Sequence, residues 1–355
     1  MTASVTKRKV YLDLIRIIAI CLVMFTHTGE KGYMLFTKLP VGSVSYWLCL
    51  FNAILVKAAV PLFFMVSGAV LLGKKESLSD VLRRFFRILT VLLAVSLCAY
   101  CCKCFLEQND FSFRNFLVTV YTKQAATPLW YLYAYLAYVL MLPFLRPLAQ
   151  NLDRDGYRWL FVLYGIVSIL PVVEYMIGQG SFSHNRHFSF FITANTFFYP
   201  LAGYFFDHLI RKEQLNRQTL AGLVLAGTAA IAVCCGMTHW HCILIGEWKE
   251  KTCQVFFQTL TFLPAFAVFY AVRMFFERHS LSERVQYWIV RIGDAAFGVY
   301  LIEWFCRKVT EKIFYTLQPV LHTLPACWIW LAAAFILGTF IILILKKIPV
   351  IRKFL

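Results

Sequence analysis

The sequence predicts an all-α polytopic membrane protein with about ten transmembrane helices and both termini in the cytoplasm. Hydrophobic residues make up 60% of the 355 residues and charged residues only 15%, whereas a soluble domain carries about 25% charged residues. Apolar runs of about 20 residues, the length that crosses a bilayer, recur along the chain. No loop between them is long enough for a soluble domain, so we expect a single transmembrane domain over residues 1–355 with no fused soluble domain.

The expected spans follow these apolar runs in order. The first begins after a basic N-terminus, contains Arg16 and lacks a small-residue cleavage site. It is therefore predicted to be a span and not a cleaved signal peptide. Proline and glycine interrupt several runs, which membrane helices tolerate. The ten spans are predicted at residues 10–29, 45–72, 85–106, 128–148, 158–177, 188–208, 219–237, 254–276, 292–315 and 325–347.

The distribution of charge predicts orientation. The net charge is +17, but the basic residues are spread over short loops and form no continuous groove for nucleic acid. With the N-terminus inside, the cytoplasmic segments hold about twice as many lysines and arginines as the outer segments, which is the bias that orients membrane helices. We therefore expect a multi-pass protein of the plasma or inner membrane whose surroundings are the lipid bilayer.

Arg16 and His27 lie in the first span with ten residues between them. Because a helix turns 100° and rises 1.5 Å per residue, eleven steps place both side chains on nearly the same face, about 16 Å apart. An ionisable residue inside a span is costly and indicates a functional site. His27, near the outer end, is a candidate general base, and a packed interfacial histidine is the alternative.

Arg16 has a candidate partner in Asp13, one helical turn earlier. If Asp13 neutralises Arg16, the pair is structural. Otherwise Arg16 is available to an anion that enters from the cytoplasm. Both interpretations stay open.

The second span contains candidates for a substrate channel. Ser67 and Gly68 are small enough to allow a close approach to the backbone, and Phe63 and Phe64 precede them.

Just past this span, Arg84 and Arg87 are three residues apart and share a helix face at the inner surface. Two guanidiniums can bind phosphate, and the alternative is ordinary cytoplasmic charge in contact with anionic lipid.

Aromatic and acidic residues supply the remaining candidates. The fourth span opens with Trp130, Tyr131 and Tyr133, which predict either an interfacial aromatic belt or a platform for a sugar. Glu174 and Glu303 lie within later spans, and either could orient His27 as an acid orients the histidine of a triad or pair with an arginine.

No metal site is expected. His239 and His241 have a spacing that suits a metal only weakly, and they are predicted to be exposed loop residues.

Taken together, the motifs resemble those of the acyltransferase-3 integral membrane acyltransferases, in particular the short surface-polysaccharide O-acetyltransferase type. The matching motifs, in chain order, are Arg16-x10-His27, Phe63-Phe64-x-x-Ser67-Gly68, Arg84-x-x-Arg87, and the later blocks PLWYLYAYL and AFGVYLIE. The resemblance covers essentially the whole chain. One departure is Glu303, which stands where many relatives have a histidine.

The resemblance implies ten spans and acyl transfer across the membrane. The donor would be cytoplasmic acyl-CoA, acetyl-CoA in the first instance, and the acceptor an extracytoplasmic or lipid-linked glycan. His27 would be catalytic, and the arginine motifs would bind the donor. A separate extracytoplasmic partner is compatible with the family, and acetyl and succinyl donors are not distinguished. A multi-span transporter or flippase for a glycan is the alternative function, because buried Arg, His and Glu also suit a transport path.

Overall fold

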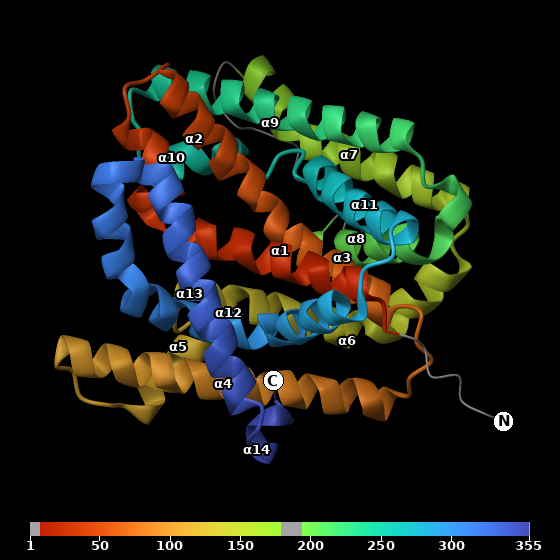
Figure 1. The fold of residues 1–355 in the computed structure, drawn as a ribbon, viewed down its shortest axis with the longest axis horizontal. Helices are drawn as coiled ribbons and strands as arrows, with labels where there is room; N and C mark the ends of the chain where they lie inside the picture. Colours follow the sequence, from red (N-terminus) through yellow and green to blue (C-terminus); the bar gives the residue numbers. More distant parts are fainter. Residues whose placement is uncertain (1–7, 179–193, 355) are drawn as a thin grey trace.

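The computed structural model describes residues 8–178 and 194–354, and all regular structure in these two ranges is helical. Figure 1 shows long helices, among them α1, α4, α7 and α9, that run roughly along the longest axis of the molecule. The helices are α1 (Val10–Thr26), α2 (Val44–Leu55), α3 (Ala59–Leu71), α4 (Leu78–Glu107), α5 (Phe113–Thr122), α6 (Trp130–Asn151), α7 (Arg154–Ile177), α8 (Asn195–Tyr204), α9 (Arg217–Ile245), α10 (Glu250–Cys253), α11 (Phe262–Arg278), α12 (Glu283–Leu321), α13 (Thr323–Leu345) and α14 (Pro349–Arg352).

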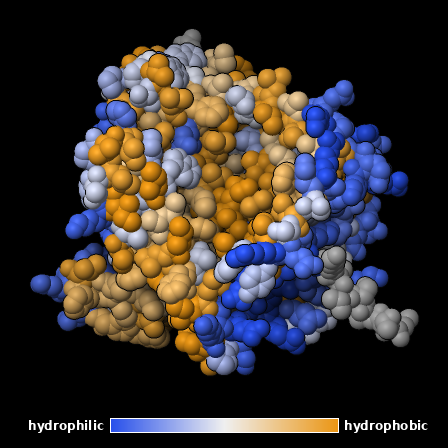
Figure 2. Space-filling view, in the orientation of Figure 1, coloured by the Kyte–Doolittle hydropathy of each residue, from blue (hydrophilic) through white to orange (hydrophobic). Residues whose placement is uncertain are grey.

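The helices agree with an all-α membrane protein. Apolar residues cover the centre of the face shown in Figure 2, and hydrophilic residues gather toward the side on which α1 begins. Within the described ranges, six segments are long and apolar enough to cross a bilayer: Val44–Leu71, Leu78–Glu107, Thr127–Asn151, Arg154–Ile177, Arg217–Ile245 and Thr323–Leu345. α1 and α11 are shorter, with 17 residues each. The count of ten spans and the cytoplasmic termini stay predictions.

Two predicted spans differ from continuous helices. The predicted span 45–72 is broken by a short 3-10 turn at Val56–Ala58. The predicted span 254–276 is wrong in its first part, because the long helix begins only at Phe262. Pro264 explains this start, since proline fits the first turn of a helix and disrupts its interior. The predicted span 188–208 lies partly outside the described residues, and α8 with the π-helical turn Phe205–Leu209 occupies the rest.

α1 is the central helix of the molecule. It packs against α3, α11, α12 and α13, and its side chains belong to both of the large hydrophobic clusters. The helix ends at His27, whose N–H bonds to the Met24 carbonyl at 3.2 Å. Gly29 then turns the chain with a φ of 55°, a conformation that glycine adopts without steric cost. His27 is thereby held at the end of a helix that is packed on several sides.

α3 and α8 are in backbone contact. A Cβ atom added at Gly68 would overlap the backbone of Pro200, and one added at Gly203 would overlap the backbone of Met65. Two small residues thus let the helices approach more closely than any larger residue allows, as in many membrane helix pairs.

The end at which α3 meets α4 is held by Glu76. Its carboxylate accepts two hydrogen bonds from Arg84, both 2.9 Å long, and one of 2.6 Å from Arg146. Arg146 also donates to the Leu71 carbonyl at 3.0 Å. Hydrogen bonds from Arg84 and Arg146, against the opposing effect of burial, lower the pKa of Glu76 to about 2. One carboxylate therefore joins the α3–α4 loop to α4 and α6.

We predict that Gly68→Ala lowers the free energy of unfolding by about 1–3 kcal/mol, the usual cost of forcing a group into a packed interface. The measurement is thermal unfolding in detergent. The matched control is Gly222→Ala in α9, where an added Cβ meets nothing within 4 Å. Equal unfolding temperatures for the two variants would contradict the α3–α8 contact.

We predict that Glu76→Gln is less stable than the wild type by about 1–3 kcal/mol, because two guanidiniums lose their charged acceptor. The pKa of Glu76 is depressed in the folded state, so its contribution is complete above about pH 4.5 and is lost as the pH falls toward 2. Unfolding measured across this range should show the two proteins converging in acid. A difference that does not change with pH would refute the assignment.

Candidate functional site

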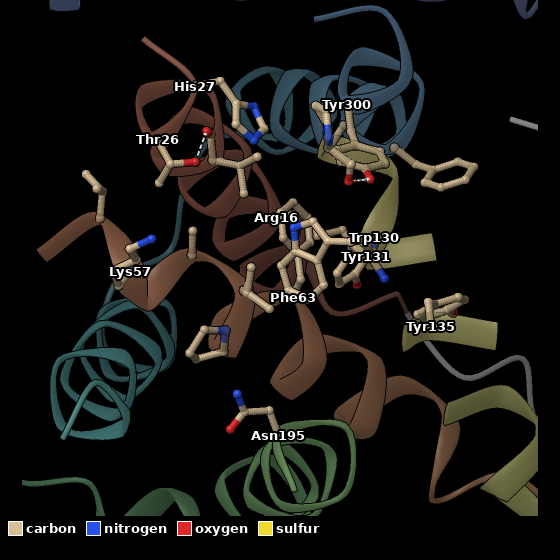
Figure 3. A pocket seen from close by; sticks show the side chains of 18 of the residues that line it. Arg16, Thr26, His27, Lys57, Phe63, Trp130, Tyr131, Tyr135, Asn195 and Tyr300 are labelled. Carbon is tan, nitrogen blue, oxygen red and sulfur yellow. Dashed lines mark hydrogen bonds between the residues drawn. The ribbon is translucent and has the colours of Figure 1, made fainter. Parts of the chain in front are cut away.

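A cavity of about 570 Å³ lies beside α1 and contains both Arg16 and His27. Its walls come from α1, α3, α4, α6, α8, α12 and the segment that links α9 to α11, and Figure 3 shows part of its lining. The polar and aromatic residues on its walls include Arg16, His27, Tyr33, Lys57, Phe63, Ser67, Arg87, Trp130, Tyr131, Tyr135, Asn195, Tyr199, Glu250, Gln254, Gln258, Asp294 and Tyr300. The two residues of the Arg-x10-His motif therefore face one space.

His27 is hydrogen-bonded to Glu303 of α12. Its Nδ1 lies 3.0 Å from the Glu303 Oε1, and the Glu303 side chain is 1% exposed. A buried carboxylate in this position accepts the Nδ1 proton and leaves Nε2 as the basic nitrogen of the neutral ring. Within the described ranges no protein group is hydrogen-bonded to Nε2.

Arg307 completes this group of side chains. It lies one helical turn beyond Glu303 and bonds to it through Nε and, at 3.2 Å, through Nη2. Its Nη1 donates to the backbone carbonyl of His27 at 2.7 Å. Because the Arg307 charge offsets that of Glu303, the carboxylate can stay ionised in a buried place. Arg307 was not singled out as a site residue from the sequence. The i, i+4 spacing from Glu303 could have indicated this ion pair.

The two acidic candidates are thus separated by the fold. Glu303 lies against His27, whereas Glu174 lies in α7 and is not among the residues that line the cavity. Glu174 is not hydrogen-bonded to His27, and a catalytic role for it stays a prediction.

Arg16 shares its acidic partner with a second arginine. The Arg16 Nη1 lies 2.6 Å from Asp13 Oδ1, and Arg8 donates to both oxygens of the same carboxylate at 2.8 and 2.9 Å. Asp13 is 1% exposed, whereas 30% of the Arg16 side chain is exposed and lines the cavity. Asp13 therefore pairs with Arg16, but Arg8 shares this carboxylate. Arg8 also lies 3.6 Å from Asp294, which Lys346 binds at 2.7 Å. Two carboxylates face three cations, and one positive charge is left over.

The predicted pair of Arg84 and Arg87 is divided. Arg87 lines the cavity, and no acidic side chain of the described ranges lies within ion-pair distance of it. Arg84 does not line the cavity, because Glu76 in the preceding loop binds its guanidinium. Arg16 and Arg87 are thus the two arginines that line the cavity, and the phosphate site formed by Arg84 and Arg87 together stays a prediction.

The candidate channel wall on α3 is also divided. Phe63 and Ser67 line the cavity, with the Ser67 hydroxyl bonded to the Phe63 carbonyl at 2.9 Å. Phe64 is buried against Tyr131 and Tyr138. The group that approaches Gly68 is the backbone of Pro200, and Gly68 is not among the residues that line the cavity. A substrate contact at Gly68 stays a prediction.

The aromatic candidates on α6 are divided between the cavity and α5. Trp130 lines the cavity, but Tyr133 donates its hydroxyl to the Val120 carbonyl at 2.8 Å and faces α5. Tyr131 and Tyr135 occupy the cavity wall as well. Tyr131 was one of the aromatic candidates, whereas Tyr135 was missed because one tyrosine in a row of aromatic residues cannot be told from the next before the helix is oriented.

His239 and His241 are not exposed loop residues as predicted. Both lie in α9, where a tyrosine hydroxyl, from Tyr46 and Tyr175 respectively, is 3.2 Å and 2.8 Å from the Nδ1 atom. These contacts explain them as packing residues.

The cavity therefore has two chemically different regions. Arg16 and Arg87 offer positive charge in one region, and His27 with Glu303 offers a basic nitrogen in another. Since Arg16 and His27 are eleven residues apart on one helix, these regions are about 16 Å apart. An elongated molecule with an anionic head and a reactive end fits this arrangement.

A family model described as an acyltransferase domain matches residues 9–346 of this chain. No curated protein and no solved structure gives a match. The family match includes every helix from α1 to α13 and all of the cavity residues on them. The chain thus belongs to the acyltransferase-3 family and is a membrane acyltransferase.

Proposed function

We propose that this protein transfers an acyl group, in the first instance acetyl, from cytoplasmic acyl-CoA to a hydroxyl of an extracytoplasmic or lipid-linked glycan. The observation that carries the proposal is the contact between His27 and the buried Glu303 in a cavity that also contains Arg16 and Arg87. The plasma or inner membrane is the proposed location, with both termini in the cytoplasm.

The donor end of the proposal rests on charge. Coenzyme A carries several phosphate charges, and guanidiniums bind phosphate through charge-assisted hydrogen bonds. Arg87 has no acidic partner in the described ranges, and Arg16 shares Asp13 with Arg8. We assign the CoA phosphates to these two arginines, and the thioester arm would extend past Phe63 and Ser67 toward His27.

The chemical step uses His27 as general base. Nε2 removes the proton from a glycan hydroxyl, and the hydroxyl oxygen attacks the thioester carbonyl. The carbon–sulfur bond then breaks, an ester forms, and the departing CoA thiolate takes the proton from His27. Glu303 orients the ring and stabilises the imidazolium that forms in between, and Arg307 holds Glu303 in place.

We predict that His27→Ala lowers the rate of acetyl transfer by about 10²–10⁴-fold, the usual contribution of a general base. The measurements are transfer or hydrolysis of labelled acetyl-CoA by purified protein and O-acetylation of surface glycans in cells. The control is His279→Ala, because His279 is exposed and its ring bonds to the carbonyl of Phe275 in the last turn of α11, which it follows directly. Near-normal acetylation by correctly inserted His27→Ala protein would remove the mechanism.

The same assay separates enzyme from carrier. If the wild type binds glycan but neither transfers nor hydrolyses the label, the transporter alternative is favoured and the proposed function is wrong.

We predict that Arg16→Ala and Arg87→Ala each weaken CoA binding by about 10–100-fold, since each removes a charged hydrogen-bond donor. Isothermal titration of CoA measures this. Arg83→Ala is the control, because Arg83 lies on the same helix as Arg87, is 79% exposed and pairs with Asp80. Arg84→Ala should change stability more than affinity. Equal affinities for wild type and both cavity variants would place the donor elsewhere.

A further inference from the structure

Lys57 is a cation at the centre of a membrane-spanning segment. It lies in the 3-10 turn Val56–Ala58, between α2 and α3, in the apolar segment Val44–Leu71. An ionisable residue at such a depth is costly and is retained where it serves a function. Lys57 lines the cavity that contains His27, and Figure 3 shows its side chain on the wall formed by this turn.

No acidic side chain in the described ranges lies within ion-pair distance of Lys57. Its ammonium nitrogen lies 4.8 Å from the centre of the Tyr33 ring, a cation–π contact. Glu250 also lines the cavity and acts electrostatically on both Lys57 and Tyr33 without a direct contact. Its Oε1 accepts a hydrogen bond from the Gln254 Nε2 at 2.7 Å. By contrast, Arg16 in the same cavity has Asp13 beside it.

Tyr33 adds a second, independent observation. Its side chain lines the cavity and is 3% exposed, yet its hydroxyl has no hydrogen-bond partner among the residues that the structure describes. Buried hydroxyls are normally hydrogen-bonded, and one without a partner calls for an explanation. The Lys57 ammonium contacts the ring that carries the Tyr33 hydroxyl, and neither group has a hydrogen-bond acceptor in the described ranges. Together they form a pair of donors suited to a carboxylate.

This donor set lies on the His27 side of the cavity. Tyr33 follows His27 by six residues, and its N–H bonds to the hydroxyl of Thr28 at 2.9 Å. The turn that carries Lys57 packs against α1. A carboxylate held there would belong to a molecule that also reaches the reacting centre.

We propose that Lys57 and Tyr33 form a carboxylate-binding site for one of the two substrates, which rests on the proposed acyl transfer. The carboxylate belongs either to an acidic acceptor sugar or to the far end of a dicarboxylic acyl group. An acetyl group and a neutral sugar have no such carboxylate and would leave both donors without an acceptor.

The test compares matched ligands on purified protein by isothermal titration. Digalacturonate is compared with its methyl ester, and succinyl-CoA with acetyl-CoA. We expect the wild type to bind the carboxylate form of one pair about tenfold more tightly. A preference in the first pair identifies the acceptor as the source, and one in the second identifies the acyl group.

Three variants connect this preference to the site. Lys57→Met keeps the length of the side chain without its charge and should abolish the preference, whereas Lys57→Arg should retain it. Tyr33→Phe should reduce it. Thermal unfolding shows whether Lys57→Met is folded. A preference that Lys57→Arg retains shows that the charge at this position, and not the lysine as such, is required.

The proposal is overturned if the wild type shows no preference in either pair, or if the preference survives in Lys57→Met. Its failure is distinct from failure of the proposed function. Turnover of acetyl-CoA that depends on His27 but shows no carboxylate preference removes only this site. A Lys57-dependent preference without any acyl turnover removes the proposed function and leaves the binding site.

Discussion

The buried carboxylate of Glu303 is the constraint on which the reactive part of the molecule depends. It bonds at once to the ring of His27 and to the guanidinium of Arg307, and Arg307 also bonds to the His27 backbone. The end of α1 is therefore joined to α12 by side-chain and main-chain contacts together. Removing any one member would leave a buried polar group without its partner, which is more costly than the bond itself is stabilising.

Buried or half-buried acids also bind arginines at the other end of α1, but there two of the acids each bind two of them. Asp13 pairs with Arg8 and Arg16, and Glu76 pairs with Arg84 and Arg146. Asp294 is a second acid beside Arg8 and also binds Lys346. Both groups are thus held together by ion pairs, while their cations still outnumber their acids. The guanidiniums of Arg84 and Arg146 point to Glu76, whereas the Arg16 guanidinium also faces the cavity.

The sequence predicted the class of fold and both ends of the site, but it left the pairings open: Asp13 was one alternative for Arg16, and Glu303 was one of two acids for His27. Helix periodicity on one segment was enough to put Arg16 and His27 on one face. Choosing between Glu174 and Glu303 required knowing which helices are neighbours, which spacing within a helix cannot reveal. Arg84 and Gly68 were predicted to contact ligands because the sequence does not show that Glu76 and Pro200 contact them in the folded chain. Lys57 carried a signal, a charge in the middle of an apolar run, that was not used.

The contact between α3 and α8 has a consequence for how the cavity can admit a long substrate. α3 supplies Phe63 and Ser67 to the cavity wall and α8 supplies Asn195 and Tyr199, yet where Gly68 meets Pro200 there is no space even for a methyl group. This corner cannot close further, so adjustment of the cavity's width must come from other walls. α4 packs mainly on α6 and α5, has few buried residues and carries Arg87. If α4 bends, the Arg87 guanidinium moves with it and the width of the cavity changes. The contact between α3 and α8 stays fixed during this movement.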